Sequence, residues 1–133
     1  YILNENIMNP QTYIPGTCNI GPKEREKRQR MGLAGLMLTC GWTFLGYVWA
    51  FPLFLKMLVF IPAFISALGF IQYNSNFCVW YGFREQQNTT DNVLAVKVLD
   101  PKANEADRSK SAGLTLIALI IAFVYSLLVI LLF

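Results

Sequence analysis

Cys18-Asn19-Ile20-Gly21-Pro22 leads directly into Lys23-Glu24-Arg25-Glu26-Lys27-Arg28-Gln29-Arg30, and residues 31–55 that follow carry no formal charge. These largely apolar residues outnumber the ~20 that a helix needs to cross the hydrocarbon core of a bilayer. Gly21-Pro22 indicates a helix start, because proline suits the first helical position. The sequence therefore predicts an interfacial helix that runs into a first transmembrane span over residues 22–51. The five cations beside the span predict that this end of the helix lies on the cytoplasmic side.

Two further apolar segments complete the predicted architecture. Residues 52–82 contain a second span followed by an aromatic segment at the membrane surface, and residues 113–133 form a third span without a charge. Pro52 follows the first span so closely that the second span must return antiparallel to it, as a helical hairpin. We therefore expect an all-α membrane protein, a helical hairpin plus a third transmembrane helix, with the N-terminus inside and the C-terminus outside.

The polar parts of the chain are predicted to lie together on the inner side of the membrane. They are an extended N-terminal arm, residues 1–21, and a cytoplasmic connecting segment, residues 83–112. Both are too polar and too short to bury a core, so we expect a partner to order them. Within the connecting segment, residues 93–98 favour a short strand or an extended strip, and Asp100-Pro101 indicates a helix start.

The composition narrows the classes of function. The 133 residues are 55% hydrophobic, with a mean hydropathy of +0.43. The net charge of +3 arises from cations gathered beside the spans, which indicates contact with anionic lipid rather than nucleic acid. The chain has no histidine, the commonest metal ligand, and its spans carry no charged side chain except Lys56. We therefore expect no metal site, no cofactor of its own and no enzymatic activity.

Small residues in the spans predict where helices pack closely. Glycine and alanine let two helices approach in lipid, where no hydrophobic driving force brings them together. Ala63 and Ala67 are expected to face the first span, and Pro62 is expected to kink the second. Such stripes can also form part of the binding surface for a lipid, a quinone or a pigment that belongs to a host complex. The residues predicted to pack helices are Gly32, Gly35, Ala63, Ala67, Ala118, Ala122 and Ser126.

Cations at the membrane surface form a second group of candidate residues. They can hold lipid headgroups or an acidic surface of a partner, or they can be solvated residues that only set the topology. Glu24 and Glu26 dilute the positive charge of this group. The candidate lipid-binding or partner-binding residues are Lys23, Arg25, Lys27, Arg28, Arg30 and Arg84.

The cysteines are the one candidate for chemistry. Cys18 and Cys78 lie before and after the predicted hairpin, on the same side of the membrane, and could form a thiol pair. Cys18 also precedes a helix start, where a thiolate is electrostatically favoured. The alternative is that both are small packing residues, because no histidine or closely spaced second cysteine accompanies them. Cys40 lies in the middle of a span and is predicted to pack.

A motif at the start of the first span resembles a known family. Its residues are Asn19-x-Gly21-x-x-Glu24-Arg25-x-x-Arg28-x-x-x-Gly32, and Cys78, Tyr81 and Gly82 follow the second span. The pattern resembles the small bacterial YgaP-like inner-membrane hairpin domain over residues 18–84, although Val79 stands where that family usually has proline. The resemblance implies a helical hairpin in a bacterial inner membrane. Some members of the family are fused to a rhodanese sulfurtransferase domain, whose thiol chemistry makes the cysteines candidates, although no such domain fits in these 133 residues.

These observations predict one function and leave one alternative. The predicted function is an accessory, non-catalytic membrane subunit that scaffolds or stabilises a larger membrane protein complex, such as an energy-converting one, in contact with anionic lipids. The alternative is a membrane module in thiol or sulfur handling that uses Cys18 and Cys78.

Overall fold

The computed structural model describes residues 13–89 and 95–133. The described chain is mostly helical, and three of its helical segments are long and apolar enough to cross a membrane. The first twelve residues of the predicted arm lie outside the described residues, as do Val93 and Leu94 of the predicted strand.

Helix α2, Pro22–Val48, is the predicted interfacial helix and first span in one piece. Pro22 stands in the first turn, where its missing N–H costs no hydrogen bond, and Glu24 lies where the helix dipole favours a carboxylate. The 27 residues make a helix about 40 Å long. The chain then reverses through Ala50, which has a left-handed backbone (φ +49°), and forms the predicted hairpin.

The second span is interrupted once. It consists of α3, Leu53–Met57, and α4, Phe60–Ser75. Pro62 explains the interruption, because proline lacks an N–H and its ring clashes with the carbonyl group four residues earlier, that of Leu58. The Leu58 carbonyl instead accepts a hydrogen bond from the Ile61 N–H (3.2 Å), in a tighter turn. The predicted kink is therefore present.

Residues 76–100 connect the hairpin to the last helix. Asn76, in the left-handed conformation (φ +54°), ends α4. Helix α5, Val79–Phe83, follows, and then strand β1, Gln86–Gln87, which pairs antiparallel with β2, Val96–Lys97. The described chain is still mostly helical, and β2 lies within residues 93–98, for which a short strand or an extended strip was predicted.

Helix α6, Pro101–Leu132, contains the third span and is longer than predicted. As the motif Asp100-Pro101 predicted, the Asp100 carboxylate caps the helix by accepting the Lys102 N–H at 3.1 Å. The helix begins well before Gly113, because the charged residues that mark the membrane edge are good helix formers and nothing interrupts them. Its 32 residues span about 48 Å, more than the ~30 Å hydrocarbon core.

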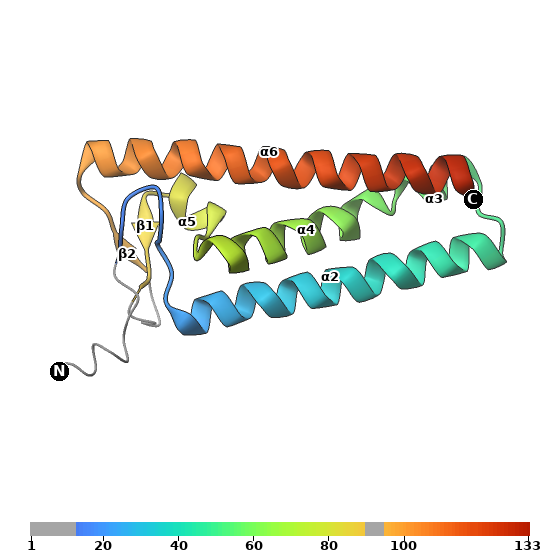
Figure 1. Cartoon of the computed structure of the whole chain (residues 1–133), viewed down its shortest axis with the longest axis horizontal. Helices are drawn as coiled ribbons and strands as arrows, with labels where there is room; N and C mark the ends of the chain where they lie inside the picture. Colours follow the sequence, from blue (N-terminus) through green and yellow to red (C-terminus); the bar gives the residue numbers. More distant parts are fainter. Residues whose placement is uncertain (1–12, 90–94) are drawn as a thin grey trace.

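The three long segments form a layer in which α4 lies between α2 and α6 (Figure 1). The contact between α2 and α4 is very close. An added Cβ atom at Gly69 would lie 2.5 Å from the backbone nitrogen of Gly32, and one at Gly35 would lie 2.7 Å from the backbone nitrogen of Ser66. The Ser66 hydroxyl donates a hydrogen bond to the Gly32 carbonyl (3.0 Å). Glycine therefore permits backbone contact between the two helices.

The predicted packing residues divide into those that meet a neighbouring helix closely and those beside the contact. Gly32 and Gly35 are buried against α4, as predicted, and Ala118, Ala122 and Ser126 form a buried stripe on α6. The pair predicted to face the first span, Ala63 and Ala67, is not the closest contact with α2. Ser66 and Gly69 make that contact, because their positions on α4 point directly at α2.

The described polar residues on the Pro22 side contact one another within the chain. We call residues 13–21, 76–89 and 95–107 the polar head. We call residues 13–21 the N-terminal strap of the head. In Figure 1 this strap crosses toward the start of α6. Ile20 pairs with Asn88 in a parallel bridge, and the Gly21 N–H donates to the Asn88 carbonyl at 2.9 Å.

Candidate functional site

Asn19 is the centre of the polar head. It is fully buried, and its side chain binds both backbone groups of Cys78: Oδ1 accepts the N–H at 2.7 Å, and Nδ2 donates to the carbonyl at 3.2 Å. Its own backbone N–H donates to the Asn76 carbonyl, and its carbonyl accepts the Asn88 N–H. One side chain thus joins the strap before α2 to the turn after α4. The sequence analysis singled out Asn19 as part of the motif but did not predict the groups that it binds.

Asp107 holds the other end of the strap. The carboxylate is fully buried and accepts hydrogen bonds from the Tyr13 hydroxyl (2.6 Å) and the Gly16 N–H (2.7 Å). Burial, together with the hydrogen bond to Asp107, raises the pKa of Tyr13 well above its usual value. Sequence analysis missed this contact, because more than ninety residues separate Asp107 from each partner.

The predicted lipid-binding cations fall into two groups. Arg25 and Arg28 turn inward: Arg25 Nε donates to the Tyr73 carbonyl at 2.9 Å, and its guanidinium lies 4.3 Å from the centre of the Tyr73 ring. Arg28 Nη2 lies 3.3 Å from buried Glu24 and 3.0 Å from Cys78 Sγ. The others are exposed at the surface: Lys23, Lys27, Arg30 and Arg84.

The two cysteines of the predicted thiol pair lie close to Asn19. Both are buried free thiols. The Cys18 thiol donates to the Ile20 carbonyl (3.6 Å), and burial raises its pKa. The expectation of a favoured thiolate at Cys18 is therefore wrong, because desolvation disfavours the charged form of the thiol. Within residues 13–89 and 95–133, no three Cys, Asp or Glu side chains come together as a metal site would require.

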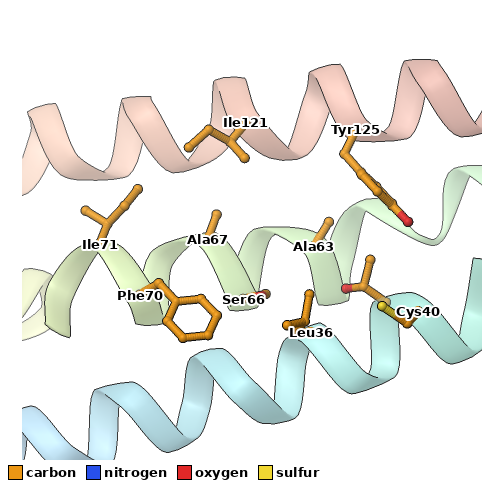
Figure 2. A pocket seen from close by; sticks show the side chains of 10 residues that line it. Leu36, Cys40, Ala63, Ser66, Ala67, Phe70, Ile71, Ile121 and Tyr125 are labelled. Atoms are coloured by element: carbon orange, nitrogen blue, oxygen red, sulfur yellow. The ribbon is translucent and has the colours of Figure 1, made fainter. Parts of the chain in front are cut away.

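A groove lies within the membrane-spanning layer, between α2 and α6 and over α4. Its volume is about 330 Å³, and its floor is α4, with α2 and α6 as walls (Figure 2). Figure 2 shows Ala63 and Ala67 on the floor, Leu36 and Cys40 on the α2 side, and Ile121 and Tyr125 on the α6 side. The groove is almost entirely apolar.

The polar atoms at the groove already have partners within the chain. The Thr39 hydroxyl donates to the Gly35 carbonyl (2.7 Å), and the hydroxyls of Thr43 and Tyr125 share a hydrogen bond (2.9 Å) that joins α2 to α6. A ligand would therefore meet shape and apolar surface rather than hydrogen-bonding groups.

The prediction that Cys40 packs is wrong, because Cys40 is exposed on the surface of the helices while Cys18 and Cys78 are buried, and this difference provides a test. We expect a maleimide to label the folded, purified protein once, at Cys40, and to leave the folded Cys40→Ser variant unlabelled. Unfolding should then expose the other two thiols. Burial raises the pKa of Cys18, so the folded state favours the neutral thiol. The contribution of this preference to the free energy of unfolding is complete below the ordinary thiol pKa near 8.5. That effect is lost as the pH rises through the raised value. Rapid labelling of folded Cys40→Ser at neutral pH, followed by mass spectrometry, would contradict the buried arrangement.

Comparison with protein-family models, curated proteins and solved structures found no match to this chain. The resemblance of residues 18–84 to the hairpin family therefore rests on its motif alone.

Proposed function

We propose that this protein is an accessory, non-catalytic subunit of a larger membrane protein complex, and that its groove over α4 seats a transmembrane helix of another subunit. In this proposal the polar head lies on the cytoplasmic side of a bacterial inner membrane, because the cations Lys23–Arg30 flank the first span there. A thiol introduced at exposed Ser109 and labelled from the outer side by an impermeant reagent would overturn this orientation.

The observation that carries the proposal is the shape and lining of the groove. The side chains of Ala63 and Ala67 on α4 are small, and residues of α2 and α6 lie on either side of them. The side chains of another helix can therefore approach the backbone of α4. Helix association in lipid depends on such close packing, because lipid tails are as apolar as the side chains they would be exchanged for.

The same lining argues for packing rather than catalysis. The hydroxyls of Thr39, Thr43 and Tyr125 are satisfied within the chain, and no charged side chain lines the groove. General acid–base or nucleophilic catalysis needs an ionisable or activated group next to the substrate. A neighbouring subunit, or a pigment or quinone held by it, needs only a complementary surface.

The test is purification of the tagged full chain from its native membranes in a mild detergent. We expect a stoichiometric partner that contains membrane spans, and we expect Cys40 to be protected from maleimide in that complex but not in the isolated chain. Ala67→Trp fills the groove and is expected to weaken retention of the partner about tenfold, the effect of ~1.4 kcal/mol.

A matched control separates the groove from general disturbance of the protein. Ala112→Trp adds the same side chain at an exposed position of α6 that does not line the groove, and it should retain the partner. Thermal unfolding of both variants checks that they fold, and Ala67→Leu gives a milder filling. A colourless, monodisperse species without a stoichiometric partner would overturn the proposal, as would full retention of the partner by folded Ala67→Trp.

The alternative is thiol handling by Cys18 and Cys78, and the burial of both thiols, which raises the pKa of Cys18, weighs against it. Replacement of both residues by serine distinguishes the two functions. An accessory subunit should still assemble with its partner, whereas loss of a thiol-dependent activity in a folded double variant would favour the alternative.

A further inference from the structure

Two cavities lie between α2 and α4 on the face of the layer opposite the groove of Figure 2. On α2, the groove is lined by Leu36 and Cys40, whereas these cavities are lined by Met31, Leu38 and Trp42. Successive residues of a helix differ by about 100° in direction, so the two sets project from opposite flanks of the α2–α4 contact. The two cavities therefore belong to one face.

The first cavity lies near the start of α2 and the end of α4, beside the charged residues 23–30, and a cationic side chain lines it. Its volume is about 230 Å³, and Arg28 is its one charged lining residue. The side chain of Arg28 is 18% exposed, so it is shielded from water without being sealed off. Trp80 lines the opposite side, and the Arg84 guanidinium lies over its ring, 5.1 Å from the centre. The lining of this mainly apolar cavity thus contains one guanidinium group, that of Arg28, and a second, that of Arg84, stacks on the lining residue Trp80.

The positive charge of this region is only partly neutralised within the chain. Glu24 is a single carboxylate that pairs with both Lys27 (3.0 Å) and Arg28 (3.3 Å). One negative charge shared by two cations leaves the mouth of the cavity positive, which favours an anion.

The second cavity continues the first into the hydrocarbon region. Its volume is about 270 Å³, and its lining is entirely apolar apart from the indole N–H of Trp42, which donates to the Leu55 carbonyl at 2.8 Å. The lining residues are Leu38, Trp42, Leu58, Ile61, Pro62 and Ile65.

Helix geometry joins the two cavities into one track. On α4, the lining residues Gln72, Leu68, Ile65 and Ile61 follow each other at intervals of three or four and so share one side of the helix. On α2, the positions between the cavities are small, Ala34 and Gly35, so no bulky side chain divides them. Arg28 and Leu38 are about 15 Å apart along the axis, half the ~30 Å hydrocarbon core.

From this juxtaposition we infer that the track binds one phospholipid with an anionic headgroup, from the leaflet on the Lys23–Arg30 side. The phosphate lies at Arg28, beside Trp80 and Arg84, and one acyl chain runs past Ala34 to Leu38 and Trp42. A guanidinium at headgroup level supplies the charge-assisted hydrogen bonds that a phosphate accepts. A track one leaflet deep fits the length of a lipid chain, whereas a helix would span both leaflets.

This site does not depend on the proposed function, because it uses the other face of the layer. Ala67→Trp should leave lipid binding unchanged, and Leu38→Trp should leave the partner subunit bound. Failure of one proposal therefore leaves the other open to its own test.

The test is native mass spectrometry of the purified full chain, titrated with phosphatidylglycerol or with phosphatidylcholine of the same chains. We expect one phosphatidylglycerol to bind in preference to phosphatidylcholine. Arg28→Gln should weaken this binding about tenfold through loss of a charge-assisted hydrogen bond. Leu38→Trp, at a 63% exposed position that tolerates a larger side chain, should weaken it to a similar degree by filling the track.

Two controls match these variants. Arg30→Gln removes the same charge half a turn away, from a side chain that is 72% exposed and paired with Glu26, and should bind within about twofold of the native chain. Met37→Trp adds the same bulk next to Leu38, at a position that lines neither cavity. Equal losses in Arg28→Gln and Arg30→Gln would overturn the site in favour of general charge attraction. Equal binding of phosphatidylcholine would overturn the role of the anionic headgroup. Complete displacement of the lipid by glycerol 3-phosphate would overturn the role of the acyl chain.

Discussion

Replacing Asn19 by alanine is expected to lower the free energy of unfolding of this protein by about 3 kcal/mol, the largest effect of a single polar substitution in the polar head. The side chain satisfies the N–H and the carbonyl of Cys78, and Asn19 is fully buried. Alanine leaves both backbone groups without a partner and leaves a small cavity in their place. Thermal or denaturant unfolding of the purified chain in detergent measures the loss.

Two further variants show whether hydrogen bonding or volume is responsible. Asn19→Asp keeps the size but cannot donate to the Cys78 carbonyl, so it should be about as damaging as alanine. Asn74→Ala makes the same change at an exposed position near the end of α4 and should alter stability by less than ~0.5 kcal/mol. Equal stability of Asn19→Ala and Asn74→Ala would show that Asn19 does not hold the head together.

Gly69→Ala is expected to destabilise the helical hairpin by about 3 kcal/mol, although alanine is the better helix former. The added Cβ would lie 2.5 Å from the Gly32 nitrogen and 2.9 Å from the Arg28 carbonyl oxygen. These are backbone atoms, so the clash is relieved only when the two helices separate. Unfolding of the purified chain in increasing dodecyl sulfate gives the free energy.

The chain provides two matched controls for this effect. An added Cβ at Gly41 or at Gly113 meets no heavy atom within 4 Å. Alanine at either position should therefore leave stability unchanged or raise it by up to ~1 kcal/mol. Destabilisation of equal size at all three glycines would mean that close contact between α2 and α4 is not what glycine provides at position 69.

Local signals predicted the helices well, because each depends on neighbouring residues. Pro22 and the Asp100-Pro101 pair mark true helix starts, and Pro62 lies one turn after the true interruption. Ala118 and Ala122 were predicted to pack from spacing alone and are fully buried. The continuity of the helix that starts at Pro101 with the third span was not predicted, because the end of the charged residues marks the edge of the membrane and not the end of a helix.

Contacts between distant parts of the chain could not be predicted in the same way. Asn19 and Cys78 are 59 positions apart, and no local pattern says which carbonyl a buried amide will bind. Gly69 was overlooked because its partner depends on the register of the hairpin. That register is set by the turn at Ala50 and the interruption before Pro62, neither of which fixes it from sequence alone. The groove was missed for the same reason, since Ala67 lies beside the helix contact and not within it.

The bond between Asp107 and the N-terminal strap has a consequence for how the protein is made. Tyr13 and Gly16 leave the ribosome more than ninety residues before the carboxylate that binds them. Asn19 likewise waits for Asn76, Cys78 and Asn88. The first hairpin can enter the membrane while its strap is still unattached, and the strap can close only after the start of the last helix has been synthesised. Completion of the polar head therefore requires synthesis of the chain as far as Asp107, and not only of its first two spans.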